Sequence, residues 1–189
     1  MSLEQLTKQL TQQSAQKPSS SSSTKQSNMP PVELWDPPYC GEIDIRITRD
    51  GTWLYNGTGF KRLSLVKLFA SVLKKEGEDY FLVTPVEKVK IVVEDAPLLL
   101  TQWQWHDQSK QSMEVTTSVD DVFSLDEHHP LTINEQGALY IAVRRNLLAK
   151  VHRNVYYQWI ELATEHETKN GTMLVFTSQG CQFSLGCIN

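Results

Sequence analysis

The densest group of side chains that could bind a ligand lies within residues 144–153. Guanidinium and ammonium groups form charge-assisted hydrogen bonds with phosphates and carboxylates, so such a group favours an anion site. A solvated basic face is the alternative, because charge clusters are common on protein surfaces. The cluster consists of Arg144, Arg145, Lys150, His152 and Arg153.

A second pair of cations, Lys61 and Arg62, follows the Gly-Thr-Gly-Phe stretch at residues 57–60. The stretch lacks the spacing of a phosphate-binding P-loop, and Arg62 stands where a dinucleotide fingerprint needs its third glycine. Free backbone N–H groups at a helix start can still hold an anion. The alternative is a loop with two solvated cations.

Aligning the two expected helices brings Arg62 and Arg153 to equivalent positions, each just ahead of its helix. We therefore predict that an anionic, nucleotide-like small molecule binds between two similar halves, without turnover. In the alternative, both arginines are solvated or paired with Glu161 or Glu165. The predicted ligand-binding residues are Lys61, Arg62, Arg144, Arg145 and Arg153.

Catalytic and metal-binding motifs are not recognisable in the chain. Cys40 has no histidine near it in sequence, and free cysteines more often act as small buried hydrophobes. His128 and His129 are adjacent, so on a strand they would point to opposite faces. The carboxylate pairs at 94–95 and 120–121 are expected at solvated strand ends. We expect no metal and no cofactor, and a hydrolytic enzyme is only the third hypothesis.

The elements that position these residues in the first half begin with a hairpin. Apolar residues alternate at 43–47, and the Arg-Asp-Gly turn at 49–51 leads into 52–55. Helical spacing of apolar residues then predicts a helix over 65–73, with Ser64 as N-cap, ending near residues 76–77. Strands are predicted at 80–84, 86–93, 98–105 and 113–122.

The second half repeats this pattern. Strands are predicted at 131–133, 138–143 and 147–151, a helix over 156–163 behind Asn154, and a final hairpin of 173–177 with 181–185. Residues 50–51, 65–69 and 81–84 correspond to 136–137, 156–160 and 174–177. We predict an α+β fold of duplicated hairpin–helix–hairpin modules. Chance agreement of two similar patterns is the alternative.

The composition of the chain limits its domain organisation, its partners and its location in the cell. Residues 1–28 are rich in Gln, Ser and Lys and are predicted to be a disordered tail ahead of modules 29–96 and 97–189. The 189-residue chain has a formal net charge of −4, which disfavours general nucleic-acid binding. Three cysteines without CxxC spacing predict neither disulfides nor a zinc site. No secretory or membrane-spanning segment is recognisable, which predicts a cytoplasmic protein.

Several long motifs resemble those of an uncharacterised bacterial family catalogued as domain of unknown function 1285. They are Leu-Trp-Asp-Pro-Pro-Tyr-Cys-Gly-Glu-Ile-Asp at 34–44, Arg-Asp-Gly-Thr-Trp at 49–53, Leu-Val-Thr-Pro-Val-Glu-Lys at 82–88 and Val-Glu-Asp-Ala-Pro at 93–97. The resemblance covers about residues 32–185. At Gly59 the chain departs from the family, which usually has proline there.

The resemblance implies a duplicated α+β architecture whose second half is similar to a pleckstrin-homology-like fold. It also implies a ligand site between the halves and a role in signalling, and it brings no catalytic residues. The alternative function is a protein-interaction scaffold, which would pair exposed strand edges with a partner and use the tail as a tether.

Overall fold

The computed structural model describes residues 7, 8, 10, 29–168 and 171–188. They form two compact units. One contains Met1–Thr48 and Thr52–Glu94, the other Arg49–Gly51 and Asp95–Asn189. Most of the predicted 1–28 tail lies outside the described residues. Thr7, Lys8 and Leu10 are helical, and Leu10 is buried.

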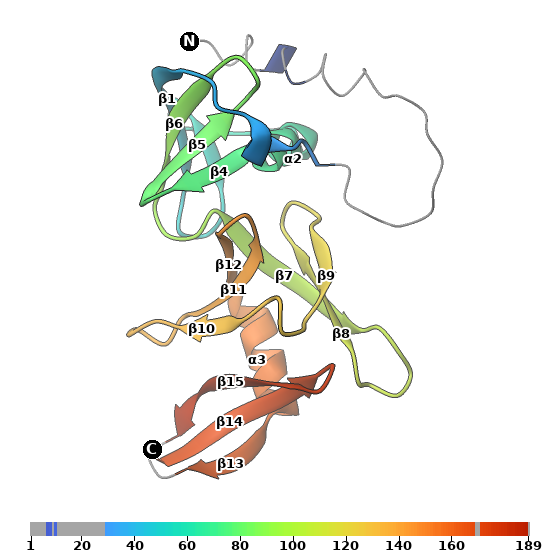
Figure 1. Cartoon of the computed structure of the whole chain (residues 1–189). Helices are drawn as coiled ribbons and strands as arrows, with labels where there is room; N and C mark the ends of the chain where they lie inside the picture. The colour runs from blue at the N-terminus through green and yellow to red at the C-terminus, as the bar shows by residue number, and fades with distance from the viewer. Residues whose placement is uncertain (1–6, 9, 11–28, 169–170, 189) are drawn as a thin grey trace, which may run out of the picture. The chain divides into compact units, whose positions relative to one another are not determined.

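The first unit is built on a six-stranded sheet (Figure 1). Its strand order is β3-β2-β1-β6-β5-β4, and β1 and β6 pair in parallel at the centre. Ile43, Ile45 and Ile47 of β1 are buried and alternate with exposed residues, as predicted. The elements are η1 (Val32–Leu34), β1 (Tyr39–Ile47), β2 (Trp53–Tyr55), β3 (Thr58–Gly59), α2 (Leu63–Ser71), β4 (Leu73–Glu76), β5 (Asp79–Val83) and β6 (Lys88–Val93).

Helix α2 connects the two halves of this sheet and buries Val66, Phe69 and Ala70. Its predicted ends were wrong. Arg62, not Ser64, is the N-cap, because the Arg62 carbonyl already accepts from the N–H of Val66. The helix stops at Ser71 because residues 73–76 pair with β5 as strand β4.

The second unit contains another six-stranded sheet, ordered β10-β11-β12-β7-β8-β9, in which β12 and β7 pair in parallel. The predicted 113–122 strand is two strands, because the chain turns at Asp120, whose φ is +64°. The strands are β7 (Leu98–Trp105), β8 (Met113–Thr117), β9 (Val122–Ser124), β10 (Leu131–Ile133), β11 (Leu139–Arg144) and β12 (Leu147–Val151).

The two sheets share one topology, which confirms the predicted duplication. In each sheet, three consecutive antiparallel strands are followed along the chain by three more. The first of the six strands pairs in parallel with the last, β1 with β6 and β7 with β12. The predicted residue correspondence was wrong, however. Helix α2 follows the third strand of its sheet, whereas the second unit's helix follows the sixth. The likeness of the second half to a pleckstrin-homology-like fold stays a prediction.

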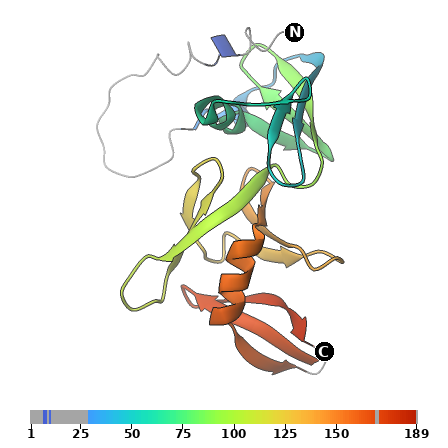
Figure 2. The same cartoon turned by 180° about the vertical axis from the view of Figure 1, so that it is seen from behind.

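Helix α3 (Arg153–Leu162) leads into a three-stranded antiparallel sheet, as Figure 2 shows from behind. Trp159 of α3 is fully buried, and its ring lies 5.0 Å from that of Phe176. The sheet has the order β13 (Thr164–Thr168), β14 (Gly171–Ser178), β15 (Cys181–Ile188). Strand β13 was not predicted from the sequence, because its Thr-Glu-His-Glu-Thr stretch has no alternating apolar residues. None of the helices in the described part of the chain is long and apolar enough to cross a membrane.

Candidate functional site

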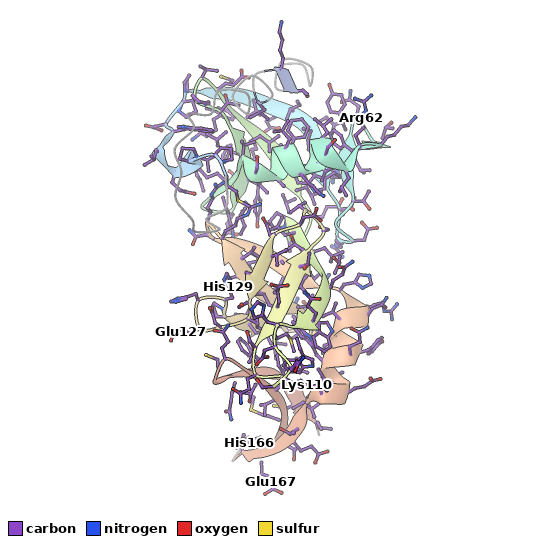
Figure 3. The ribbon with its side chains drawn as sticks, turned by 90° about the vertical axis from the view of Figure 1, so that its right-hand side faces the viewer. Arg62, Lys110, Glu127, His129, His166 and Glu167 are labelled. Carbon is purple, nitrogen blue, oxygen red and sulfur yellow. The ribbon has the colours of Figure 1, made fainter. Side chains whose placement is uncertain are left out.

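The start of α2 presents two adjacent cations, Lys61 and Arg62, both exposed (Figure 3 labels Arg62). Arg62 is in an extended conformation, with φ −111° and ψ 109°, and its side chain does not cap the helix. The first N–H groups of an α-helix have no partner within the helix. An exposed helix start without a side-chain cap therefore offers donors and a partial positive charge to an anion.

The loop ahead of α2 is anchored by aromatic contacts. Asn56 and Gly57 adopt positive φ angles of +47° and +73°, which turn the chain from β2 into β3. Phe60 then packs at 5.7 Å from Phe69 of α2 and at 6.5 Å from Tyr55 of β2, measured between ring centroids. Tyr55 and Phe60 are both half-buried, and Phe60 directly precedes Lys61 and Arg62 in the chain.

Lys61 and Arg62 have no salt bridge within the part of the chain that the structure describes. The lysines of β4 and β6, in contrast, are all paired with carboxylates. Their Nζ atoms give Lys74–Glu76 at 3.1 Å, Lys75–Glu78 at 3.9 Å, Lys88–Glu76 at 2.8 Å and Lys90–Asp79 at 2.8 Å. The two cations at the start of α2 are therefore available to an outside anion.

Arg144, in the second unit, has a partner inside the fold. Its Nε donates to Asp121 Oδ2 at 3.1 Å, and Asp121 is buried. Burial raises the pKa of Asp121, while the positive charge of Arg144 acts in the opposite direction. This ion pair ties the end of β11 to the turn between β8 and β9, which is a structural use of the arginine.

Arg145 and Arg153 lie at opposite ends of β12. Arg145 and Asn146 form the tight turn between β11 and β12, with φ angles of +50° and +59°. Arg153 is the first residue of α3, and its guanidinium lies 5.9 Å from the centre of the Tyr157 ring. Because a strand rises about 3.3 Å per residue, the five residues of β12 separate these arginines by roughly 17–20 Å.

The remaining members of the predicted cluster also have structural partners. Lys150 Nζ donates to Asp95 Oδ2 at 2.6 Å, and the Tyr140 hydroxyl donates to Asp95 Oδ1 at 2.7 Å. Burial and the Asp95 hydrogen bond raise the pKa of Tyr140 to about 12. His152 caps α3, since its Nδ1 accepts from the N–H of Asn154.

The residues that were considered, and rejected, as catalytic or metal-binding have ordinary surroundings in the structure. The Cys40 thiol is exposed, contrary to the expectation of a buried side chain, and donates to the Pro38 carbonyl at 3.3 Å. His129 packs on Phe123 at 4.1 Å between centroids, and its Nδ1 lies 2.8 Å from the Ala142 carbonyl. The described residues hold no group of three or more His, Cys, Asp or Glu side chains arranged around a metal.

Two features of the site were missed by sequence reasoning. The pairing of Tyr55 and Phe60 beside the cations depends on the β2–β3 turn, and the Asp95–Tyr140–Lys150 network joins residues far apart in sequence. The adjacent acids had been expected as solvated strand ends. Glu94 instead pairs with Arg46 at 3.1 Å, and Asp95 with Lys150. The placement of a ligand between the halves stays a prediction.

The fold and this site define a duplicated α+β protein with an exposed pair of cations at a helix start. The chain matches the N-terminal domain of the "Domain of unknown function (DUF1285)" over residues 30–96 and the C-terminal domain of the same family over residues 97–185. It therefore belongs to the DUF1285 family.

Two solved structures resemble the chain. A DUF1285 family protein from Silicibacter pomeroyi DSS-3 is 36% identical, with a TM-score of 0.74, covering 87% of this chain and 91% of that one. A DUF1285 family protein from Shewanella baltica OS155 is 32% identical, with a TM-score of 0.53, covering 63% of this chain and 91% of that one. No curated protein matches the chain.

Proposed function

We propose that this chain is a non-catalytic regulatory protein that binds an anionic, nucleotide-like small molecule and takes part in signalling in the cytoplasm. The observation that supports this most directly is the start of α2, where Lys61 and Arg62 are exposed and have no salt bridge with another described residue. Arg144, Arg145 and Arg153 remain predicted contributors, although Arg144 is already paired with Asp121.

The chemistry of this helix start suits a phosphate group. A guanidinium can donate two parallel hydrogen bonds to phosphate oxygens, and the adjacent ammonium adds a point charge. The N-terminal N–H groups of α2 supply further donors. The partly exposed rings of Tyr55 and Phe60 offer apolar faces on which a base could stack.

The test is calorimetric titration of ATP and of inorganic pyrophosphate into the full chain and into a Lys61→Gln, Arg62→Gln double variant. We expect the double variant to bind at least about tenfold more weakly, because two charge-assisted contacts are lost. At 100 times its dissociation constant, the ligand should stabilise the wild type by about 2.7 kcal/mol. Binding of ATP but not pyrophosphate would show that the base is also recognised.

The matched control is Lys110→Gln, which removes one exposed cation from the loop between β7 and β8 of the second unit. This variant should bind like the wild type. If the Lys61/Arg62 variant binds as tightly as Lys110→Gln, the site at α2 is wrong. A loss of affinity in Arg153→Ala alone would move the site to α3.

An interaction scaffold is the second candidate, favoured by strand β13. All five residues of β13 are exposed, and the strand lies at the edge of its sheet. An edge strand presents backbone N–H and C=O groups to which an extended segment can add. Glu165 and Glu167 share one side of β13, so they would favour a basic partner strand.

This second candidate is tested by hydrogen exchange of the β13 amides with a peptide of alternating lysine and valine. Slower exchange in residues 164–168, lost in a Glu165→Gln, Glu167→Gln variant, would support the scaffold. Unchanged exchange at saturating peptide would count against it.

A further inference from the structure

The three-stranded sheet of the second unit carries a row of three metal-binding side-chain types, one on each strand. His166 of β13 is directly opposite Met173 of β14, and Met173 is directly opposite Cys187 of β15. Residues directly opposite one another in antiparallel strands project from the same face of the sheet. His166, Met173 and Cys187 therefore form one continuous row on one face.

The row is accessible from solvent. His166 and Cys187 are exposed, Met173 is half-buried, and Cys187 is a free cysteine. Figure 3 shows His166 and Glu167 at the outer rim of this sheet. Directly opposite side chains have Cβ atoms about 4.5–5.5 Å apart, so the Met173 thioether lies within reach of both neighbours.

The kinds of ligand in the row are soft. A thiolate, a thioether and an imidazole together favour Cu(I), whereas carboxylates and water favour harder ions. The neighbouring acids of β13, Glu165 and Glu167, alternate with His166 and so belong to the opposite face of the sheet. The His, Cys, Asp and Glu side chains of the described residues form no metal-binding group of three by themselves. A methionine thioether can supply the additional ligand.

We propose that this face of the sheet binds one Cu(I) ion through Cys187 Sγ and Met173 Sδ, with the His166 imidazole as the third ligand. Cys187 binds as the thiolate and releases its proton to solvent, and the copper stays in the same oxidation state. Three adjacent strands hold the three side chains in register on one face, with Met173 between the other two. This site is independent of the anion site proposed at α2.

The experiment is an anaerobic titration of the full-length, reduced protein with Cu(I), using bicinchoninate as a coloured competitor. We expect the wild type to withdraw one equivalent of Cu(I) from the competitor. Cys187→Ser should lower the affinity about 100-fold or more, since even the loss of an outer-shell partner of a metal ligand costs about 10–100-fold. Met173→Leu and His166→Asn should each lower it by about tenfold on the same basis.

The chain supplies its own matched controls in Cys181 and Cys40. Cys181 lies on the same strand as Cys187, pairs with Ser178 and is half-buried, whereas Cys40 belongs to the first unit. Cys181→Ser and Cys40→Ser should bind Cu(I) like the wild type. If either control loses the copper, or if Cys187→Ser keeps it, the proposal is overturned.

A second measurement needs no substitution. One equivalent of Cu(I) should protect Cys187 from alkylation by iodoacetamide, as measured by mass spectrometry, while Cys40 is still alkylated. Equal alkylation of Cys187 with and without Cu(I) would overturn the proposal. One equivalent of Zn(II) that protects Cys187 as well as Cu(I) does would overturn the assignment of a soft-metal site.

Discussion

At the scale of single residues, the salt bridges show which cations are already paired inside the fold and which are available to bind a ligand. Arg144 and Lys150 are held by Asp121 and Asp95 inside the second unit. Removing one partner of such a pair leaves a poorly solvated charge, so these pairs are poorly suited to exchange for a ligand. Lys61 and Arg62 are exposed and have no salt bridge in the described chain, so ligand binding there would not break an existing ion pair.

Tyr140 gives a pH-dependent prediction at this scale. Burial and the Asp95 hydrogen bond raise its pKa to about 12, above the ordinary value of about 10 for an unfolded chain. The folded state therefore holds the phenolic proton more tightly, and the stabilisation is present below pH 10 and lost as the pH rises toward 12. We expect urea denaturation to show this loss in the wild type.

Tyr140→Phe should remove that part of the loss between pH 10 and 12, because no phenolic proton remains to titrate. It should also cost about 1 kcal/mol at neutral pH, the usual net value of a hydrogen bond. Tyr157→Phe, at an exposed tyrosine, serves as the control and should follow the wild type. An unchanged pH profile in Tyr140→Phe would contradict the interpretation.

At the scale of elements, α3 stabilises the second unit by packing against both β7 and β14. Its inner face buries Val155 and Trp159, and its outer face carries Arg153 and Tyr157. Trp103 of β7 also donates from Nε1 to Gln158 Oε1 at 2.7 Å. The helix thus joins the six-stranded sheet to the three-stranded sheet.

Trp159→Ala should lower the free energy of unfolding by about 3–5 kcal/mol, because it removes a fully buried ring that packs on Phe176. The Trp159 Nε1 is buried and has no hydrogen-bond partner among the described residues, so Trp159→Phe loses no hydrogen bond and should cost less. Tyr157→Ala, on the exposed face, should cost within about 0.5–1 kcal/mol. Equal losses in Trp159→Ala and Tyr157→Ala would show that the inner face of α3 is misassigned.

At the scale of the whole molecule, the charge balance limits which partners can bind. The formal net charge is −4 and the isoelectric point is about 5.7. Phosphate backbones bind proteins mainly through many cations that displace counterions. The lysines of β4 and β6 are all paired with acids, so the cations of these strands do not form an extended basic surface.

We expect no shift of random duplex DNA by the full chain at 150 mM salt, because its net charge of −4 is unfavourable for binding phosphates. The titration should extend to about 100 µM protein, since non-specific DNA-binding proteins have dissociation constants of about 10⁻⁴–10⁻⁶ M. The Lys61→Gln, Arg62→Gln variant provides the comparison. DNA binding that weakens steeply with salt in the wild type would contradict the exclusion of general nucleic-acid binding. Binding that disappears in the variant would assign it to the α2 site.

The sequence by itself determined the family, the alternating core of β1 and the presence of two helices and a duplicated α+β design. These features depend on local patterns, such as Ile43, Ile45 and Ile47 with side chains on one face. The predicted equivalence of Arg62 and Arg153 failed because two short amphipathic helices look alike in sequence wherever they occur in a topology.

Only the tertiary structure decided which charged side chains form ion pairs with one another and which strands pair. The Arg144–Asp121 and Lys150–Asp95 pairs join residues 23 and 55 positions apart, so no local pattern predicts them. Strand β13 has no apolar alternation and exists because β14 supplies its hydrogen-bond partners. The row of His166, Met173 and Cys187 likewise depends on the register of three strands, which is a property of the folded sheet and not of sequence spacing.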